Sequence, residues 1–413
     1  MTPELKGFLL VASVKMLVVF VVVLVWVALL TLMERKVSAW IQNRLGPNRV
    51  GPGGLLQPVA DGIKNFIKEE TLPKVANPVL FVLAPAMSFI PAMLLSAVIP
   101  FAAPLPLEFD FTLPLVGRMV HSGATPMVVA DLPVGFLFVL AVSSMGVYGI
   151  AIAGWSSNSK YSLLGGLRAS AQMVSYEVAL GLSVLPILLL AGNVSFSSVI
   201  AEQQAGLWYV LPLFLSFFVF LISGLAETNR LPFDMPEAES ELIAGYHTEY
   251  SAMKFAMFFI AEYANMITVS AMTATLFLGG WDIPFTAWDQ QGGVAQTLAT
   301  GGFFVAKVMV FIFIFMWIRW TLPRFRYDQL MALGWKFLIE VATVYFVVIA
   351  IAIHLIGRVW GVTDPRAMGL WLFGLNLVLC YVVFMLLDRG VVIEGSSPQR
   401  RPAPTEALES EWR

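Results

Sequence analysis

Long runs of apolar residues, separated by short polar stretches, repeat along the whole chain. Nine of these runs are about 20 residues long, the length that predicts a transmembrane helix. Because backbone groups in hydrocarbon must be paired within their own segment, we expect each run to be helical. The approximate bounds are 9–32, 78–100, 128–153, 171–191, 208–226, 253–278, 304–322, 337–357 and 368–387. The pattern therefore predicts an all-α polytopic membrane protein.

The composition supports a membrane protein and limits its chemistry. Of 413 residues, 58% are hydrophobic and 13% are charged, and the mean hydropathy is +0.80. The single cysteine, Cys380, excludes an internal disulfide and any cluster ligated only by this chain's cysteines. The three histidines, His121, His247 and His354, fall in separate regions, which disfavours a bis-histidine haem. We therefore expect no bound metal, no haem and no redox centre in this chain.

An amphipathic segment follows the first apolar run. At helical spacing its apolar positions share one face and its polar positions share the other, which is typical of a helix lying in the membrane interface. The apolar face consists of Leu55, Leu56, Val59, Ile63, Phe66 and Ile67, and the polar face of Asp61, Lys64, Asn65 and Lys68. Such a helix could form the mouth of a cavity that opens to lipid, or it could be a plain basic anchor.

The basic residues predict the orientation of the chain. Nineteen of the 25 lysines and arginines lie on alternate loops that begin with 33–77, and on the C-terminal tail. Cytoplasmic loops carry an excess of Lys and Arg. We therefore expect the N-terminus to be outside, and nine crossings then place the tail in the cytoplasm.

The segment 226–242 is an acidic, proline-interrupted loop between two apolar runs. Carboxylates at a bilayer edge require partners, protons or water, because burying a charge near hydrocarbon is unfavourable. Five of them lie within fifteen positions: Glu227, Asp234, Glu237, Glu239 and Glu241. The last charged loop before the C-terminal spans supplies three candidate counter-ions, which could equally be anchors at the membrane surface: Arg319, Arg324 and Arg326.

Two further carboxylates lie inside apolar runs. Glu177 follows Tyr176, and Glu262 precedes Tyr263. Carboxylates within a membrane commonly mark a proton or ion pathway, although either residue could instead pack by a hydrogen bond to a neighbouring helix. Together with the acidic loop they favour a pathway.

Five stretches of the chain carry a resemblance to a known family. They are residues 34–36 with 42–49, 226–242, 166–172 with 175–177, 249–250 with 261–263, and 323–331. In these stretches the chain closely resembles the quinone-site membrane subunit, of the NuoH type, of the proton-pumping NADH:quinone oxidoreductase, respiratory complex I. The resemblance covers about residues 10–357. It implies a domain at 1–360 with eight core helices, so that 361–390 is an additional helix, and the polar tail 391–413 is expected to be disordered.

The resemblance implies that this subunit forms the floor and entrance of a quinone chamber. It assigns to the chamber or its mouth Glu34, Arg35, Arg44, Asp61, Lys64, Lys68, Arg230 and Phe233. It assigns to a relay that couples quinone reduction to proton pumping Glu227, Asp234, Glu237, Glu239, Glu241, Glu177, Tyr176, Glu262, Tyr263, Glu249, Arg168, Arg319, Arg324 and Arg326. Quinone would bind at the subunit interface, and FMN and iron–sulfur clusters would lie in partner subunits.

The same resemblance implies partners and a location. The partners would be the soluble subunits that carry the terminal cluster, and the small membrane subunits that lead to the pumps, in a bacterial inner membrane. Three alternatives remain open from the residues. One is the homologous membrane anchor of a hydrogenase-type complex. Another is a proton or cation transporter, against which the absence of an internal repeat argues; a purely structural anchor is the third.

Overall fold

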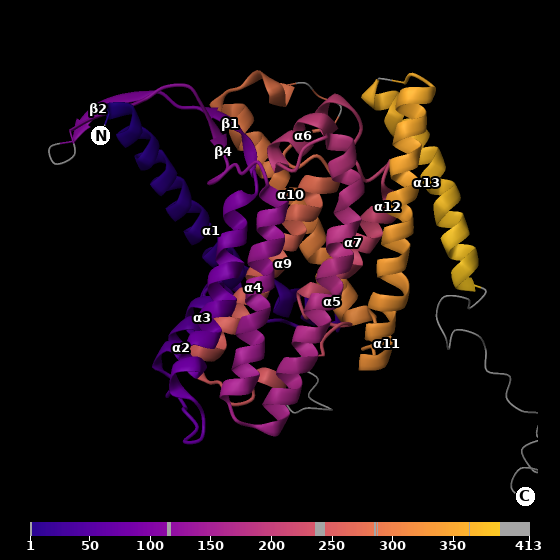
Figure 1. Cartoon of the computed structure of the whole chain (residues 1–413). Helices are drawn as coiled ribbons and strands as arrows, with labels where there is room; N and C mark the ends of the chain where they lie inside the picture. Colours follow the sequence, from indigo (N-terminus) through magenta and orange to yellow (C-terminus); the bar gives the residue numbers. More distant parts are fainter. Residues whose placement is uncertain are drawn as a thin grey trace, which may run out of the picture.

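The computed structural model describes residues 2–113, 117–235, 244–284, 286, 288–362 and 364–388. Within these residues eight helices are long and apolar enough to cross a membrane, and a shorter apolar helix, α7 (Phe214–Glu227), lies among them (Figure 1). The eight include α1 (Pro3–Ile41), α3 (Pro78–Leu95), α4 (Gly135–Ser156), α5 (Lys160–Ala191), α9 (Ala252–Phe277), α10 (Val294–Thr321) and α13 (Pro365–Asp388). The remaining one is a continuous rod made of α11 (Tyr327–Ala332), η5 (Leu333–Leu338), α12 (Ile339–His354) and η6 (Leu355–Val359).

Each of the nine predicted runs corresponds to one of these helices, so the all-α membrane fold is confirmed. In the run 208–226 the helix, α7, begins at Phe214, later than predicted. Residues 209–213 form turns, because Pro212 lacks the N–H that a helix interior requires. Val210 instead donates its N–H to the carbonyl of Phe277, at 2.9 Å. The predicted additional helix at 361–390 is α13, and the tail 391–413 lies outside the described residues.

The first helix extends well beyond its apolar run. α1 contains 39 residues, which at 1.5 Å per residue makes it on the order of 58 Å long. It continues through Glu34 and Arg35 to Ile41, so the charged motif that follows the first run is helical. Ser38 lies one turn after Glu34 and donates its hydroxyl to the Glu34 carbonyl at 2.5 Å. The motif therefore presents its side chains from one rigid element.

Strands form at the end of the bundle where the chain begins, which we call the hairpin end (Figure 1). β1 (Ala102–Pro106) pairs antiparallel with β4 (Ala124–Met127), and β2 (Phe109–Leu113) pairs antiparallel with β3 (Gly117–His121). These strands were not predicted, although in β2 Phe109, Phe111 and Leu113 alternate with Asp110 and Thr112, as residues of a half-buried strand do. Three short elements lie in other connections: η2 (Ser96–Val98), α6 (Phe196–Ala205) and η4 (Trp288–Gln291).

The opposite end, which we call the charged end, carries α2 (Gln57–Ile67) and α11 (Figure 1). The predicted amphipathic helix is therefore present, preceded by η1 (Pro52–Gly54). Its predicted apolar face is uncovered: Val59, Ile63, Phe66 and Ile67 are all more than half exposed. A largely exposed apolar helical face suits a position in the membrane interface.

Helix α9 is the most buried of the spans and contacts α1, α3, α7 and α10. Close approach is possible because small residues face it. At Gly224 of α7, a Cβ atom would lie 2.5 Å from Cγ1 of Val269 of α9. Since lipid provides no hydrophobic driving force between helices, such close packing is what holds membrane helices together. This packing places the end of α7, with Glu227, next to α9, with Glu262.

Candidate functional site

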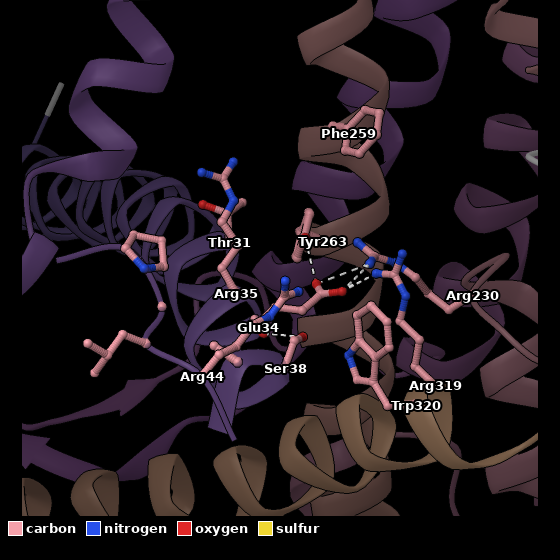
Figure 2. A pocket seen from close by; sticks show the side chains of 14 residues that line it. Thr31, Glu34, Arg35, Ser38, Arg44, Arg230, Phe259, Tyr263, Arg319 and Trp320 are labelled. Carbon is pink, nitrogen blue, oxygen red and sulfur yellow. Dashed lines mark hydrogen bonds and ion pairs between the residues drawn. The ribbon is translucent and has the colours of Figure 1, made fainter. Parts of the chain in front are cut away.

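A cavity of ≈ 570 Å³ lies at the charged end, between α1, α9, α10 and the loop after α7 (Figure 2). This size falls within the usual range for small-molecule sites. Four of the fourteen residues that line it are arginines. The lining residues are Thr31, Glu34, Arg35, Ser38, Ala39, Arg44, Leu45, Gly46, Pro47, Arg230, Phe259, Tyr263, Arg319 and Trp320.

The carboxylate of Glu34 is the centre of this cavity's polar wall. Arg230 donates from Nη1 to its two oxygens at 3.3 and 3.2 Å, and the Tyr263 hydroxyl donates to it at 2.6 Å. Arg319 also donates to Glu34 from Nη1 (Figure 2). The Glu34 and Arg230 side chains are each 8% exposed, so this is a buried charged cluster. Helices α1, α9 and α10 and the loop after α7 each supply one member.

Arg230 and Arg319 each have N–H donors that Glu34 does not use. Nε and Nη2 of Arg230 and Nε of Arg319 have no hydrogen-bond partner among the described residues, although they are buried. Burial lowers the pKa of Arg230, but Tyr263 and Glu34 outweigh it, so the pKa lies above its usual value. The guanidinium therefore stays charged and stacks over the Tyr263 ring, 4.2 Å from its centroid. A ligand with acceptor oxygens would match these donors.

The mouth of the cavity is held to α2. Arg35 forms an ion pair with Asp61 of α2 at 2.7 Å, and Lys36 donates to the carbonyl of Gly53, in η1 just before α2, at 2.6 Å. Arg44 lines the cavity itself. The other two basic residues predicted here do not line it: Lys64 is exposed on α2, and Lys68 is exposed at the C-cap of that helix.

The predicted chamber residue Phe233 is buried away from this cavity. Its ring packs 5.6 Å from Tyr176 and 5.4 Å from Phe325, measured between centroids. Tyr176 in turn donates its hydroxyl to the carbonyl of Leu330 at 2.9 Å. Phe233 therefore ties the acidic loop to α5 and to the segment before α11.

The acidic loop is also fixed by Gln172 of α5. Its Nε2 donates to the carbonyls of Ala226 and Phe233 at 2.8 and 2.7 Å, and to Oδ1 of Asn229 at 3.3 Å. Gln172 belongs to one of the family motifs but was not among the predicted site residues. A buried amide among the apolar residues of α5 is the signal that could have identified it.

The three predicted counter-ions of the acidic loop separate into different roles. Arg324 pairs with Asp234 at 3.0 Å, whereas Arg319 binds Glu34 instead. Arg326 is the N-cap residue of α11, and its backbone N–H donates to the side chain of Gln329 at 3.1 Å. The other predicted carboxylates of the loop, Glu237, Glu239 and Glu241, lie outside the described residues.

A second polar cluster surrounds Glu177. Ser144 and Ser143 of α4 donate to its Oε1 at 2.5 and 3.4 Å. Glu227 is buried close by, interacts electrostatically with Glu177 and also contacts Ser143. Neither serine was predicted from the sequence, although two adjacent hydroxyls inside an apolar run were a visible signal.

Glu262 completes a line of carboxylates. It is buried on α9 and accepts a hydrogen bond from the Tyr246 hydroxyl, of η3 (Gly245–His247), at 3.4 Å. A small cavity of ≈ 20 Å³ is lined by Glu227 and Glu262, among others. This volume is enough for one water molecule, which could bridge the two carboxylates. Glu262 also interacts electrostatically with Arg230, so this line reaches the Glu34 cluster.

The two remaining predicted relay residues lie at the edge of these clusters. Arg168 stacks over the ring of Tyr327, 5.4 Å from its centroid. Glu249 is half-buried in the turn after η3. Across the described ranges, the structure contains no group of three His, Cys, Asp or Glu residues that could hold a metal ion.

Comparison with known proteins gives a consistent match. Residues 14–350 match the family described as NADH dehydrogenase. The chain is 50% identical over 353 residues to the second NADH-quinone oxidoreductase H subunit of Koribacter versatilis, which covers 84% of this chain and 98% of that protein. It is 44% identical over 399 residues to the NADH-quinone oxidoreductase H subunit of Streptomyces avermitilis, covering 96% of this chain and 84% of that one. The second match is long enough to include α13.

Proposed function

The chain belongs to the NADH dehydrogenase family as a membrane subunit of NADH-quinone oxidoreductase, respiratory complex I, and we propose that it forms the membrane wall and entrance of that complex's quinone chamber. The observation that carries this proposal is the Glu34 cluster. A carboxylate held by Arg230, Arg319 and Tyr263 lines a ≈ 570 Å³ cavity, and the arginines retain donors for a ligand. The oxygens of a quinone head group are acceptors of the matching kind.

The exposed apolar face of α2 supports an entrance on the lipid side. A quinone tail is apolar and travels within the bilayer, and α2 joins the cavity mouth through the Arg35–Asp61 ion pair. Phe66 and Ile67 are 79% and 78% exposed, so this helix offers an apolar surface at membrane depth. The head group would enter past Arg35 and Arg44.

We further propose that the buried carboxylates pass on the charge change that quinone reduction produces. In a line of interacting carboxylates, a change of charge at one member shifts the proton affinity of the next. The line from the Glu34 cluster through Glu262 and Glu227 to Glu177 supplies such members. The Ser143 hydroxyl contacts both Glu227 and Glu177, while Tyr246 donates to Glu262 and Ser144 to Glu177. The roles of Glu237, Glu239 and Glu241 in this relay are proposed from the family resemblance alone.

We also propose a position for the chain in the complex. The charged end would face the cytoplasm, as the basic residues indicate, in a bacterial inner membrane. The soluble subunits with FMN and iron–sulfur clusters would cover the Glu34 cavity, and the small membrane subunits would contact the flank that carries Glu177. Quinone would be held at the interface with these partners.

The experiment that tests the proposal is quinone titration of the assembled complex. In membranes, Arg230→Gln and Arg319→Gln should lower the rate of NADH:quinone reduction, while electron transfer from NADH to ferricyanide through the soluble arm continues. The control is Arg118→Gln on the hairpin end, which should change neither rate. Unchanged quinone kinetics in both arginine variants of an intact complex would refute the chamber wall at this site.

A further inference from the structure

A second cavity, of ≈ 410 Å³, lies between α1, α9 and α10 toward the hairpin end, far from the Glu34 cluster along α1. Its floor is formed by α9, where Ile267 and Ala271 are buried. Its sides belong to α1 and α10, where Val22 and Leu298 are 46% and 72% exposed. Because the floor is closed and the sides are exposed, the cavity opens sideways between α1 and α10, toward the hydrocarbon of the bilayer.

The lining of this cavity is apolar. No charged side chain lines it among the described residues, and its polar groups are the hydroxyls of Ser96, Thr268 and Thr297 and the indole N–H of Trp26. Thr297 already donates its hydroxyl to the carbonyls of Pro104 and Gly293. An occupant must therefore be a hydrocarbon chain in the part that enters the cavity.

A cation lies at the rim. Lys15 of α1 donates from Nζ to the carbonyls of Pro126 and Val128, at 3.2 and 2.8 Å. These two residues flank Met127, which lines the cavity, and Val18 lines it one turn further along α1. An ammonium has three donors, and no carboxylate pairs with Lys15 among the described residues. One donor and the full charge are thus available to an anion.

The depth of Lys15 fits a lipid head group. Glu34 follows Lys15 by nineteen positions along α1, which at 1.5 Å per residue is about 28 Å, close to the thickness of the hydrocarbon core. Trp26, which lines the cavity, lies about 16 Å along α1 from Lys15 by the same rise. The cavity therefore occupies one leaflet, with Lys15 at its polar surface.

We propose that this cavity binds an anionic phospholipid of the leaflet on the hairpin side. The phosphate of the head group contacts Lys15, and one acyl chain lies between α1 and α10 against the floor formed by α9. The charge at the rim selects an anionic head group, and the apolar lining selects the chain. The lipid would fill a gap between two spans that the protein's own side chains leave open.

Glycines offer a way to block the cavity without disturbing the rim. Gly302 of α10 lines the cavity, and a Cβ atom placed there would meet no heavy atom within 4 Å. Gly302→Leu should therefore fold and place its side chain in the open space. Gly374 of α13 offers the matched control, because it lines a different apolar cavity and also has open space around it.

The test is lipid analysis of the assembled complex, purified in detergent and exchanged into nanodiscs that contain equal parts of phosphatidylglycerol and phosphatidylcholine. Native mass spectrometry of the released full-length chain should show retained phosphatidylglycerol. Lys15→Gln should lower its retention by about fivefold, as expected for one cation at a membrane surface. Lys15→Arg should preserve it, Gly302→Leu should abolish retention of either lipid at this position, and Gly374→Leu should leave it unchanged.

Several outcomes would overturn the proposal. If phosphatidylcholine were retained in the same amount as phosphatidylglycerol, and Lys15→Gln changed neither, the cavity would not prefer an anionic head group. Retention unaffected by Gly302→Leu would place the bound lipid elsewhere. If the molecule lost in Gly302→Leu were a quinone, the cavity would hold a quinone tail and no phospholipid.

Discussion

The carboxylate of Glu34 and the guanidinium of Arg230 lie 3.2 Å apart, although 196 residues separate them in the sequence. They join the end of the first helix to the loop that follows α7, at the wall of the cavity proposed for quinone (Figure 2). Arg319 and Tyr263 contact the same carboxylate from α10 and α9. One buried charge therefore organises four segments of the charged end.

Replacing Glu34 should lower both the thermal stability of the complex and its rate of quinone reduction. In Glu34→Gln, the buried Arg230 loses the carboxylate that it pairs with directly, and breaking a buried pair in this way costs about 3 kcal/mol. We expect a lower thermal denaturation midpoint for the purified complex and slower quinone reduction. The comparison variant is Asp110→Asn, which breaks the exposed Arg118–Asp110 pair and should leave the midpoint unchanged. Equal effects of the two variants would contradict a special role for the buried cluster.

Replacing Glu177 should lower quinone reductase activity and leave assembly of the complex intact. Glu177→Gln keeps the shape of the side chain and an acceptor for the Ser144 hydroxyl, but it removes the titrating group. We expect an intact complex whose quinone reductase activity falls by about tenfold or more, the scale of a lost proton-transfer group. Glu202→Gln, on the exposed surface of α6, is the control. A Glu177→Gln complex with undiminished activity and pumping would remove Glu177 from the relay.

The described part of the chain does not include Glu241, for which the family resemblance makes the same prediction. Glu241→Gln should leave assembly intact and lower quinone reductase activity. The measurement is the same pair of assays, namely complex recovery and NADH:quinone reduction. Normal activity in this variant, beside a defective Glu177→Gln, would confine the relay to the membrane carboxylates.

The apolar face of α2 should help quinones with long tails to bind. Phe66→Gln places a polar group on a face that is otherwise apolar and exposed, so α2 should sit less deeply in the interface. We expect the KM for a long-tailed quinone to rise several-fold, while the kcat for a short-tailed analogue stays the same. Asn65→Ala, on the polar face, should have neither effect. Equal changes for both quinones would argue against an entrance beside α2.

The additional helix α13 should contribute to stability rather than to catalysis. Asn376 of α13 is buried, accepts a hydrogen bond from the Tyr345 hydroxyl at 2.8 Å and donates to the carbonyl of Pro212. Truncation after Trp360 leaves both groups unpaired, which costs about 1 to 3 kcal/mol for each buried group. We expect retained quinone reduction and a lower thermal midpoint.

The point variant Asn376→Leu should reproduce part of this loss of stability with α13 still in place. If the truncated chain assembled but lost quinone reduction entirely, α13 would be more than a stabilising element. Measuring both variants in the same complex separates the two roles.

The sequence by itself determined the elements and much of the chemistry. Nine apolar runs predicted nine helices, because the length of an apolar run and the pairing of its backbone groups are local properties. The 3.6-residue period predicted α2, and the distribution of Lys and Arg over alternate loops predicted which end would carry the charges. The motifs around Glu34 and Arg230 were sufficient to indicate the family.

Only the tertiary structure decided which charges meet. The sequence offered Arg319 as a partner of the acidic loop, but helix packing places it on Glu34, 285 residues away. The same packing brought Ser144 to Glu177 and left the cavity beside Lys15 open. A run of sequence encodes the face and length of a helix, whereas the partners of a side chain depend on how neighbouring helices approach, and that is set by small residues such as Gly224 at their contacts.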